Sequence, residues 1–126
     1  MPYTYDTENI FAKILRGEIP NSTVFESEHT LAFNDIAPAA PVHVLIIPKG
    51  PYVSYDHFAA EASDAEIVDF TRAIDEVCKI TGVKMDSGNG FRTIANTGRD
   101  GVQDVPHFHL HILGGRHMGP MVKKAD

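Results

Sequence analysis

The 126-residue sequence lacks tryptophan, contains a single cysteine and has no long apolar run. The lone Cys78 excludes an intramolecular disulfide and a cysteine-based zinc ribbon, and it suits a reducing compartment. No apolar run approaches the roughly 20 residues that cross a membrane, and no basic segment followed by an apolar one opens the chain. We therefore expect a cytoplasmic protein with no membrane partner.

The sequence also lacks a cluster of basic residues. Its net charge is −6 with histidine neutral, and its lysines and arginines are scattered, whereas tight nucleic-acid binding normally shows a basic face. Because such an overall charge repels anions, a phosphate-bearing ligand would have to be held locally by backbone N–H groups and imidazoles. A small nucleotide is therefore favoured over a polynucleotide, and the chain length suits one domain.

Apolar periodicity predicts two helices and several short strands. A short helix is expected after Thr7, which can cap it, and a long helix is expected from the capping box that begins at Ser63 to a stop at Gly82. Residues 49–62 are expected to form a loop that carries His57 at the surface. Strands are expected at residues 24–26, 30–34, 42–48 and 91–96.

Histidine is concentrated in one short segment, residues 106–115, where three imidazoles alternate with apolar side chains before two glycines. Period-two alternation predicts a strand with one buried face. The apolar residues of this segment, Phe108, Leu110 and Ile112, would point into a core. The three histidines, His107, His109 and His111, would then share the opposite face.

This spacing is compatible with three kinds of site. Alternate Cα atoms of a strand lie roughly 6.5 Å apart and the outer two histidines roughly 13 Å apart, so one metal ion would take an adjacent pair plus a ligand from elsewhere. A nucleophilic site would instead need one neutral imidazole that faces a substrate. A solvated polar face is disfavoured, because histidine is typical of places where titration or ligation near neutral pH matters.

The segment resembles the signature of the histidine triad (HIT) family, His-φ-His-φ-His-φ-φ with φ apolar, from His107 to Leu113. The following Gly114-Gly115-Arg116 is similar to the branch of histidine triad nucleotide-binding proteins. Further matching segments are residues 10–20, 31–36 and 40–49 together with Asn96, so that the resemblance covers most of residues 9–120.

The resemblance implies an α+β fold with an antiparallel sheet of about five strands, one long helix and one short helix. It also implies a homodimer in which the sheets of two subunits join. We expect a single HIT domain over residues 1–126, with a loose lead-in at residues 1–6 and a flexible tail at residues 117–126.

The implied activity is nucleotidyl transfer to water. His109 would attack the α-phosphorus of a nucleoside 5′-phosphoramidate or related mixed anhydride, and water would then release the nucleoside monophosphate. His111 would stabilise the phosphoryl oxygens and help to move protons, His107 would orient the strand, and His43 would complete the relay. This route requires no metal and no cofactor. From the residues alone, His43 would be interpreted as a structural histidine that opens a buried strand.

The resemblance also implies a purine nucleotide site. Apolar residues of the first helix would line the base and ribose pocket, and Asp35 would accept hydrogen bonds from the ribose hydroxyls. From composition alone Asp35 is a solvated carboxylate or an Asx-turn residue, and Asn96 is a turn residue. The complete expected set is Ile10, Phe11, Ile14, Phe33, Asp35, Ile36, Asn96, Val102 and Asp104.

The expected phosphate loop departs from the family pattern. Relatives often have Gly-Gln-Ser where this chain has Val102-Gln103-Asp104. Backbone N–H groups there can still face phosphate oxygens. The carboxylate of Asp104, however, cannot donate a hydrogen bond as serine does, and it would repel an anionic leaving group.

Three alternative functions remain open at this stage. A dinucleoside polyphosphate hydrolase of the same superfamily is disfavoured by the Gly114-Gly115 ending. A zinc-dependent hydrolase would use His109, His111 and His43 as ligands. A nucleotide-sensing interaction module would bind the same ligand with slow or incidental chemistry.

Overall fold

The computed structural model describes residues 3–124 of the chain and consists of one sheet with helices on both faces. The sheet is antiparallel and has five strands in the order β1-β2-β3-β5-β4. The α+β class and the five-stranded antiparallel sheet that were expected are therefore confirmed. The strand bounds are Thr23–Glu26 (β1), Thr30–Asn34 (β2), Val42–Pro48 (β3), Phe91–Ile94 (β4) and Leu110–Gly114 (β5).

Among the described residues, three helices accompany the sheet instead of the two that were expected: α1 (Ile10–Leu15), α2 (Tyr55–Glu61) and α3 (Asp64–Thr81). The long α3 begins at the predicted capping box and ends at Gly82, which adopts φ 74°. The first helix is capped by Asn9 and not by Thr7, because the Asn9 side chain accepts from two backbone N–H groups.

The prediction that residues 49–62 are a loop was wrong, because α2 lies within this segment. Ser54 caps the helix by accepting from the backbone N–H of His57, and Phe58 anchors it in the core. With only seven residues, α2 presents too short an apolar stripe for helical periodicity to reveal it.

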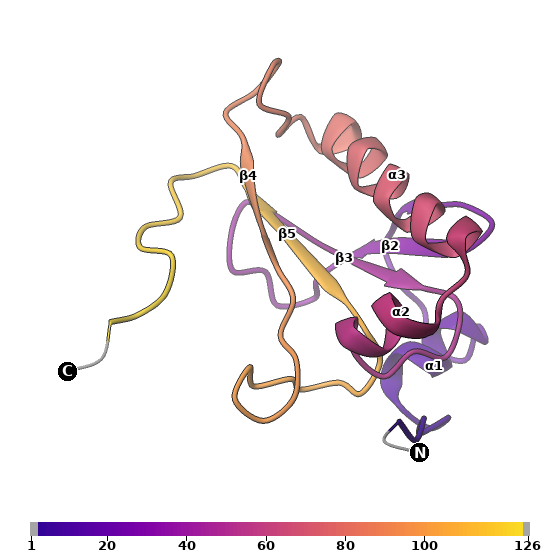
Figure 1. Cartoon of the computed structure of the whole chain (residues 1–126). Helices are drawn as coiled ribbons and strands as arrows, with labels where there is room; N and C mark the ends of the chain where they lie inside the picture. The colour runs from indigo at the N-terminus through magenta and orange to yellow at the C-terminus, as the bar shows by residue number, and fades with distance from the viewer. Residues whose placement is uncertain (1–2, 125–126) are drawn as a thin grey trace.

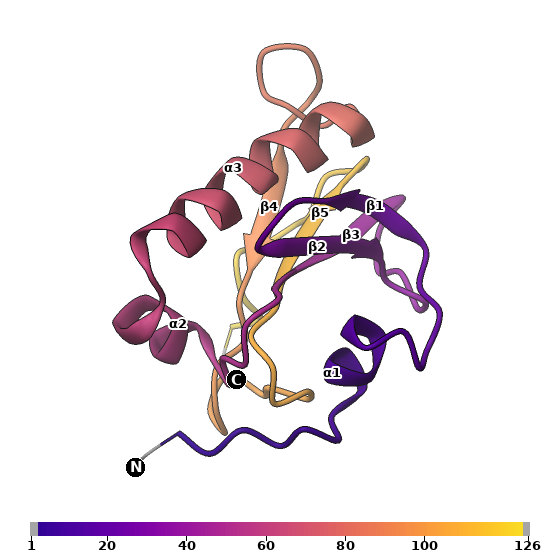
Figure 2. The same cartoon turned by 90° about the vertical axis from the view of Figure 1, so that its right-hand side faces the viewer.

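Each face of the sheet has its own apolar core. Alternate residues of β3, Val44 and Ile46, pack into the cluster that includes α3, while Leu45 and Ile47 pack on Phe11 of α1. Figures 1 and 2 show this arrangement, with α2 and α3 on one side of the sheet and α1 on the other. The face that carries α1 is the one to which His111 of β5 turns, because His111 pairs with Leu45.

The histidine segment is a strand over only part of its predicted length. Phe108, Leu110 and Ile112 are buried, as expected. Ladder pairing with β3, however, begins at Leu110 and not at His107. Pro48 at the end of β3 has no N–H to offer, and its carbonyl accepts from the His107 ring. The histidine face is also less exposed than a solvated strand face, since His107 and His109 are buried.

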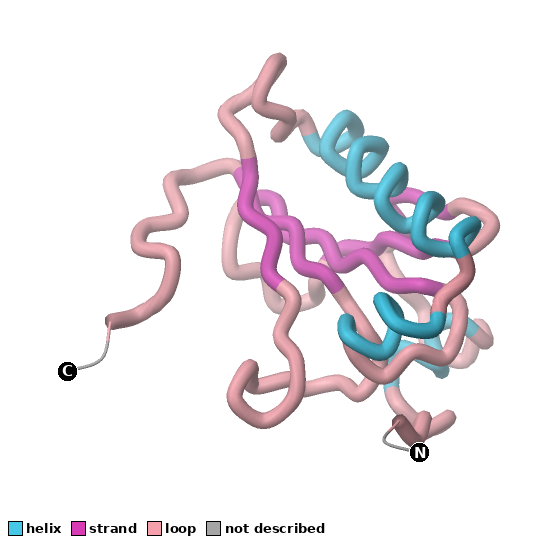
Figure 3. The backbone as a smooth tube through the Cα atoms, viewed as in Figure 1, coloured by secondary structure: helices cyan, strands magenta, loops and turns pink. Residues whose placement is uncertain are grey.

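The two terminal segments contact the body of the protein. Tyr3, in the segment expected to be loose, stacks on His57, and the Tyr5 hydroxyl bonds to the His107 ring. Arg92 donates to the carbonyl groups of Gly119 and Pro120 in the expected tail, which runs as a loop away from the helices (Figure 3). Residues 1–2 and 125–126 of these predicted segments lie outside the described residues.

Within residues 3–124, no helix has both the length and the apolar character that a membrane crossing requires.

Candidate active site

A pocket of about 240 Å³ opens on the α1 side of the sheet, between α1, the end of β2, the loop before β5 and β5 itself. Most of the residues predicted to form the site line it. The predicted residues among its lining are Ile10, Phe11, Ile14, Phe33, Asp35, Ile36, Asp104, His109 and His111.

Four predicted residues do not line this pocket. His43 and His107 lie behind its histidines and contact them through hydrogen bonds. Asn96 follows the end of β4 and is half-buried, and Val102 lies in the loop between β4 and β5 with an exposed side chain.

His109 has one ring nitrogen fixed by the backbone. Its Nδ1 lies 2.7 Å from the carbonyl oxygen of His107. A carbonyl only accepts, so Nδ1 carries the hydrogen, and in the neutral ring Nε2 then keeps a free lone pair. The buried ring is held edge-on against Phe11, with the ring centroids 5.0 Å apart. This arrangement leaves Nε2 as the nucleophilic atom of the ring.

His107 is fixed from both sides and has no exposed surface. Its Nε2 lies 2.8 Å from the Pro48 carbonyl oxygen and therefore donates, while its Nδ1 lies 2.6 Å from the Tyr5 hydroxyl and accepts. Burial lowers the pKa of His107 to about 4. The ring is thus neutral near pH 7, in the tautomer that matches both partners.

Tyr5 is the functional neighbour that sequence reasoning missed. It is 102 residues from His107 along the chain, and no local pattern connects a tyrosine near the N-terminus with the histidine segment. Only the folded path of residues 3–9 past the end of β3 brings the two side chains together.

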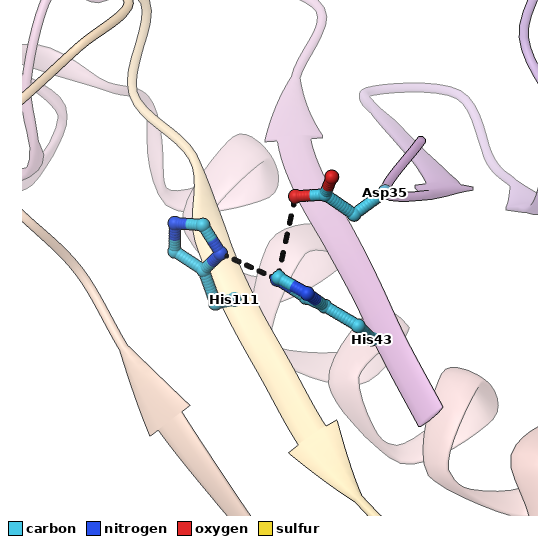
Figure 4. A group of neighbouring side chains, drawn as sticks. All are labelled: Asp35, His43 and His111. Carbon is cyan, nitrogen blue, oxygen red and sulfur yellow. Dashed lines mark hydrogen bonds and ion pairs between the residues drawn. The ribbon is translucent and has the colours of Figure 1, made fainter. Parts of the chain in front are cut away.

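Asp35, His43 and His111 form a second group at the pocket (Figure 4). The backbone N–H of Ala39 donates to His43 Nδ1 at 3.0 Å, so that the hydrogen of the neutral His43 ring is on Nε2. That Nε2 lies 2.9 Å from His111 Nδ1 and 3.4 Å from Asp35 Oδ2. His111 Nδ1 therefore accepts, which places the hydrogen of the neutral His111 ring on Nε2.

The pKa of His111 is lowered to about 4, first by burial and then by the nearby rings of His109 and His43. His111 is thus neutral near pH 7 and presents an N–H at Nε2. Asp35 also accepts from the backbone N–H of Ala37 at 2.8 Å. The Asx-turn interpretation of Asp35 is therefore correct, and it coexists with a place in the pocket lining.

The histidines do not group as the zinc interpretation expected. Within residues 3–124, the set of side chains close enough to share an ion consists of Asp35, His43 and His111, without His109. A metal ligand needs a lone pair, but the Ala39 N–H uses the one on His43 Nδ1 and assigns the hydrogen to Nε2. This hydrogen-bond pattern suits a proton relay and does not suit a metal ion.

The loop between β4 and β5 is held by Gln103, whose side-chain amide donates to the carbonyl groups of Val53 and Val105 and accepts from the Gly98 N–H. Val102 adopts φ 56°, in the left-handed region that β-branched residues avoid. This conformation gives a physical reason for the glycine that relatives often have at this position.

Asp104 lies at the end of the same loop and faces the ring of His109. Its Oδ1 is 3.4 Å from His109 Nε2 and 2.9 Å from the backbone N–H of Val105, which donates to it. The Asp104 side chain is 79% exposed, so the carboxylate lies at the mouth of the pocket and not in its interior.

The expectation that His57 lies at the surface was wrong. Its ring is buried, packs between Tyr3 and Tyr52, and accepts from the backbone N–H of Val53. Its partners come from the N-terminal segment and the turn before α2, which a local pattern does not reveal. A larger hollow of about 640 Å³ lies between α3 and β4 but has no histidine in its lining.

Comparisons with known proteins agree with this geometry. A family model described as HIT domain matches residues 16–118. A HIT-like protein of Azospirillum brasilense is 51% identical over 125 residues, covering 99% of this chain and 100% of that protein. The purine nucleoside phosphoramidase of Escherichia coli K12 is 42% identical over 115 residues, covering 91% of this chain and 93% of that protein. The solved structure of a histidine triad protein from Clostridium difficile matches with a TM-score of 0.79 at 37% identity, covering 94% of this chain and 100% of that one.

Proposed function

This chain belongs to the HIT domain family, and from that premise we propose that it hydrolyses purine nucleoside 5′-phosphoramidates, or related mixed anhydrides, to nucleoside monophosphates. The observation that carries the proposal is the tautomer of His109. Its Nδ1 hydrogen is fixed on a backbone carbonyl, so that in the neutral form of this buried ring Nε2 carries the lone pair and faces the pocket. The 42% identity to a purine nucleoside phosphoramidase supports the choice of substrate class.

In the first step, the lone pair of His109 Nε2 forms a bond to the α-phosphorus. The phosphorus–nitrogen bond breaks, its electron pair leaves with the amine nitrogen, and that nitrogen takes up a proton from water by way of His111. In the second step, water attacks phosphorus, the bond to His109 breaks, and the surplus proton returns to solvent by the same route. Over both steps, one water supplies oxygen to phosphorus and hydrogen to the amine.

The remaining histidines support these steps. His111 Nε2–H can donate to a phosphoryl oxygen, since its Nδ1 is occupied by His43. His111 and His43 form a proton relay. Asp35 is its third member, because its Oδ2 lies 3.4 Å from His43 Nε2. His107 orients the nucleophile through its carbonyl oxygen. No step passes through a metal ion or a cofactor.

The nucleoside is assigned to the apolar side of the pocket, formed by residues of α1 together with Phe33 and Ile36. Asp35, at the end of β2, is assigned as the acceptor for the ribose hydroxyls. Asn96 is assigned to the side of the leaving group and Val102 to the phosphate loop, although neither lines the pocket itself. The volume of about 240 Å³ lies just below the range of about 300–1,000 Å³ that is typical of ligand pockets, so part of a bound nucleotide would project into solvent.

We also propose that the whole chain is one HIT domain that works in the cytoplasm as a homodimer. Strand β4 forms one edge of the sheet and exposes Phe91 and Ile94, and an edge of this kind can pair with a second copy. Sedimentation analysis tests the dimer directly, because a monomer at micromolar concentration would contradict it.

Steady-state turnover of adenosine 5′-phosphoramidate tests the proposed function. We expect wild type to release AMP with and without a chelator, and His109→Ala to lose turnover while it still binds AMP. His29→Ala, which changes a histidine in the turn between β1 and β2, serves as the control and should retain activity. Loss of turnover on chelation would favour a zinc hydrolase, and binding without turnover in wild type would favour a nucleotide-sensing module. Faster turnover of dinucleoside polyphosphates would favour a dinucleoside polyphosphate hydrolase.

A further inference from the structure

The pocket contains acidic side chains that no lysine or arginine balances. Asp35 and Asp104 line it together with His109 and His111, and no lysine or arginine occurs in the described lining. His111 does not offset the two carboxylates near pH 7, because its pKa is lowered to about 4. With a chain charge of −6, the surroundings of the reacting phosphorus are negative both locally and overall.

The two carboxylates differ in what they face. Asp35 bonds to the backbone N–H of Ala37 and lies against His43. Asp104 faces His109 Nε2 across 3.4 Å, and in the neutral ring that nitrogen is an acceptor, as the carboxylate is. In that form of the ring the two groups cannot satisfy each other by a hydrogen bond, and both line the pocket in which the phosphorus–nitrogen bond is proposed to lie.

We propose that Asp104 selects substrates whose leaving amine carries a positive charge close to the phosphorus–nitrogen bond, such as a short diamine whose second nitrogen is a free ammonium group. This inference rests on the proposed function and adds the chemical class of its leaving group. Such a cation supplies the donor that Asp104 lacks and compensates the repulsion between this carboxylate and the phosphoryl oxygens. An anionic leaving group adds to that repulsion.

The expected preference is moderate, because Asp104 lies at the pocket mouth with its side chain 79% exposed. Two unit charges about 4 Å apart in water-like surroundings change a rate or equilibrium constant by about fivefold. We therefore expect about three- to tenfold steps in kcat/KM from a cationic to a neutral leaving group, and from a neutral to an anionic one. Added salt should narrow these steps.

The test uses three adenosine 5′-phosphoramidates with leaving amines of matched length: ethylenediamine, propylamine and glycine, which end in an ammonium, a methyl and a carboxylate group. The test variant is Asp104→Asn, because its side-chain oxygen still accepts from the Val105 N–H and so preserves the loop. Asp100→Asn is the matched control. It removes the same charge from the same loop, but Asp100 pairs with Arg99 in solvent and does not line the pocket.

For wild type and Asp100→Asn, we expect kcat/KM to be highest for the cationic substrate, intermediate for the neutral one and lowest for the anionic one. For Asp104→Asn, we expect the three kcat/KM values to agree within about twofold. An unchanged ranking in Asp104→Asn would overturn the inference while the proposed function stands. An equal rate for all three substrates in wild type would do the same. No turnover of even the propylamine compound by wild type would overturn the proposed function and this inference with it.

Discussion

The Tyr5 hydroxyl lies two hydrogen bonds away from His109, the proposed nucleophile, and its removal tests whether this chain of contacts matters. Tyr5 donates to His107 Nδ1 at 2.6 Å, and the carbonyl of His107 accepts from His109 Nδ1 at 2.7 Å. Tyr5→Phe keeps the edge-on packing of the ring on His107 and deletes only the donor. The His107 ring, which has no exposed surface, is then left with an unpaired acceptor.

An unpaired buried acceptor costs about 1–3 kcal/mol, and we expect Tyr5→Phe to lower the free energy of unfolding by that amount. Tyr3→Phe is the matched control from the same segment. Its hydroxyl bonds to Asp56 at an exposed position, so its loss should lower the free energy of unfolding far less than the loss of the Tyr5 hydroxyl does. Urea denaturation of the two variants beside wild type measures both values.

The same substitution should affect catalysis through the position of His109. Without the Tyr5 donor, the His107 ring can change tautomer or shift, and the carbonyl that fixes His109 Nδ1 shifts with it. We expect kcat to fall about tenfold, which corresponds to about 1.4 kcal/mol, and KM to change little because Tyr5 does not line the pocket. Equal stability and equal kcat in Tyr5→Phe and Tyr3→Phe would refute the reasoning.

Further predictions concern pH, loop strain and helix capping. The buried His107 and the less buried His111, whose pKa values are both lowered to about 4, take up protons on unfolding below about pH 6.5. His107 alone should lower the free energy of unfolding by about 2 kcal/mol between pH 7 and pH 5, and His111 should add to this fall. An equal or higher urea midpoint at pH 5 would contradict this. Val102 adopts φ 56°, and Val102→Gly removes the cost of about 1–2 kcal/mol of holding a side chain in the left-handed region. The glycine adds about 0.5–1 kcal/mol of conformational entropy lost on folding, so thermal denaturation should show an unchanged or slightly raised stability. A clear loss of stability would count against backbone strain at this position. Ser63→Ala deletes the capping box with Glu66 and should lower the urea-derived stability by about 1 kcal/mol, an effect that is absent if α3 is held by packing alone.

The elements with strong local patterns were predictable from sequence. The β3 strand has an apolar run that only His43 interrupts, and α3 has both a capping box and a terminal Gly82. These signals arise within a few residues of the chain. The α2 helix was missed because its stability depends on Phe58 in the distant core and on one serine cap, neither of which produces a visible period in seven residues.

The candidate site was predictable as a set of residues but not as a set of contacts. The spacing of the histidine segment indicates that His109 and His111 share a face, and both line the pocket. That His43 bonds to His111 depends on the register in which β3 pairs with β5. The tautomer of each ring depends on partners such as Ala39 N–H and Pro48 carbonyl, which only the folded backbone supplies.

The most direct test of the account is a search for the covalent nucleotidyl adduct on His109. Intact-protein mass spectrometry after rapid quenching without acid, with adenosine 5′-phosphoramidate as substrate, compares wild type with His109→Ala in the presence and absence of a chelator. The account predicts a transient AMP adduct on wild type alone, unaffected by the chelator. Turnover without any adduct, or an adduct of equal yield in His109→Ala, would contradict it.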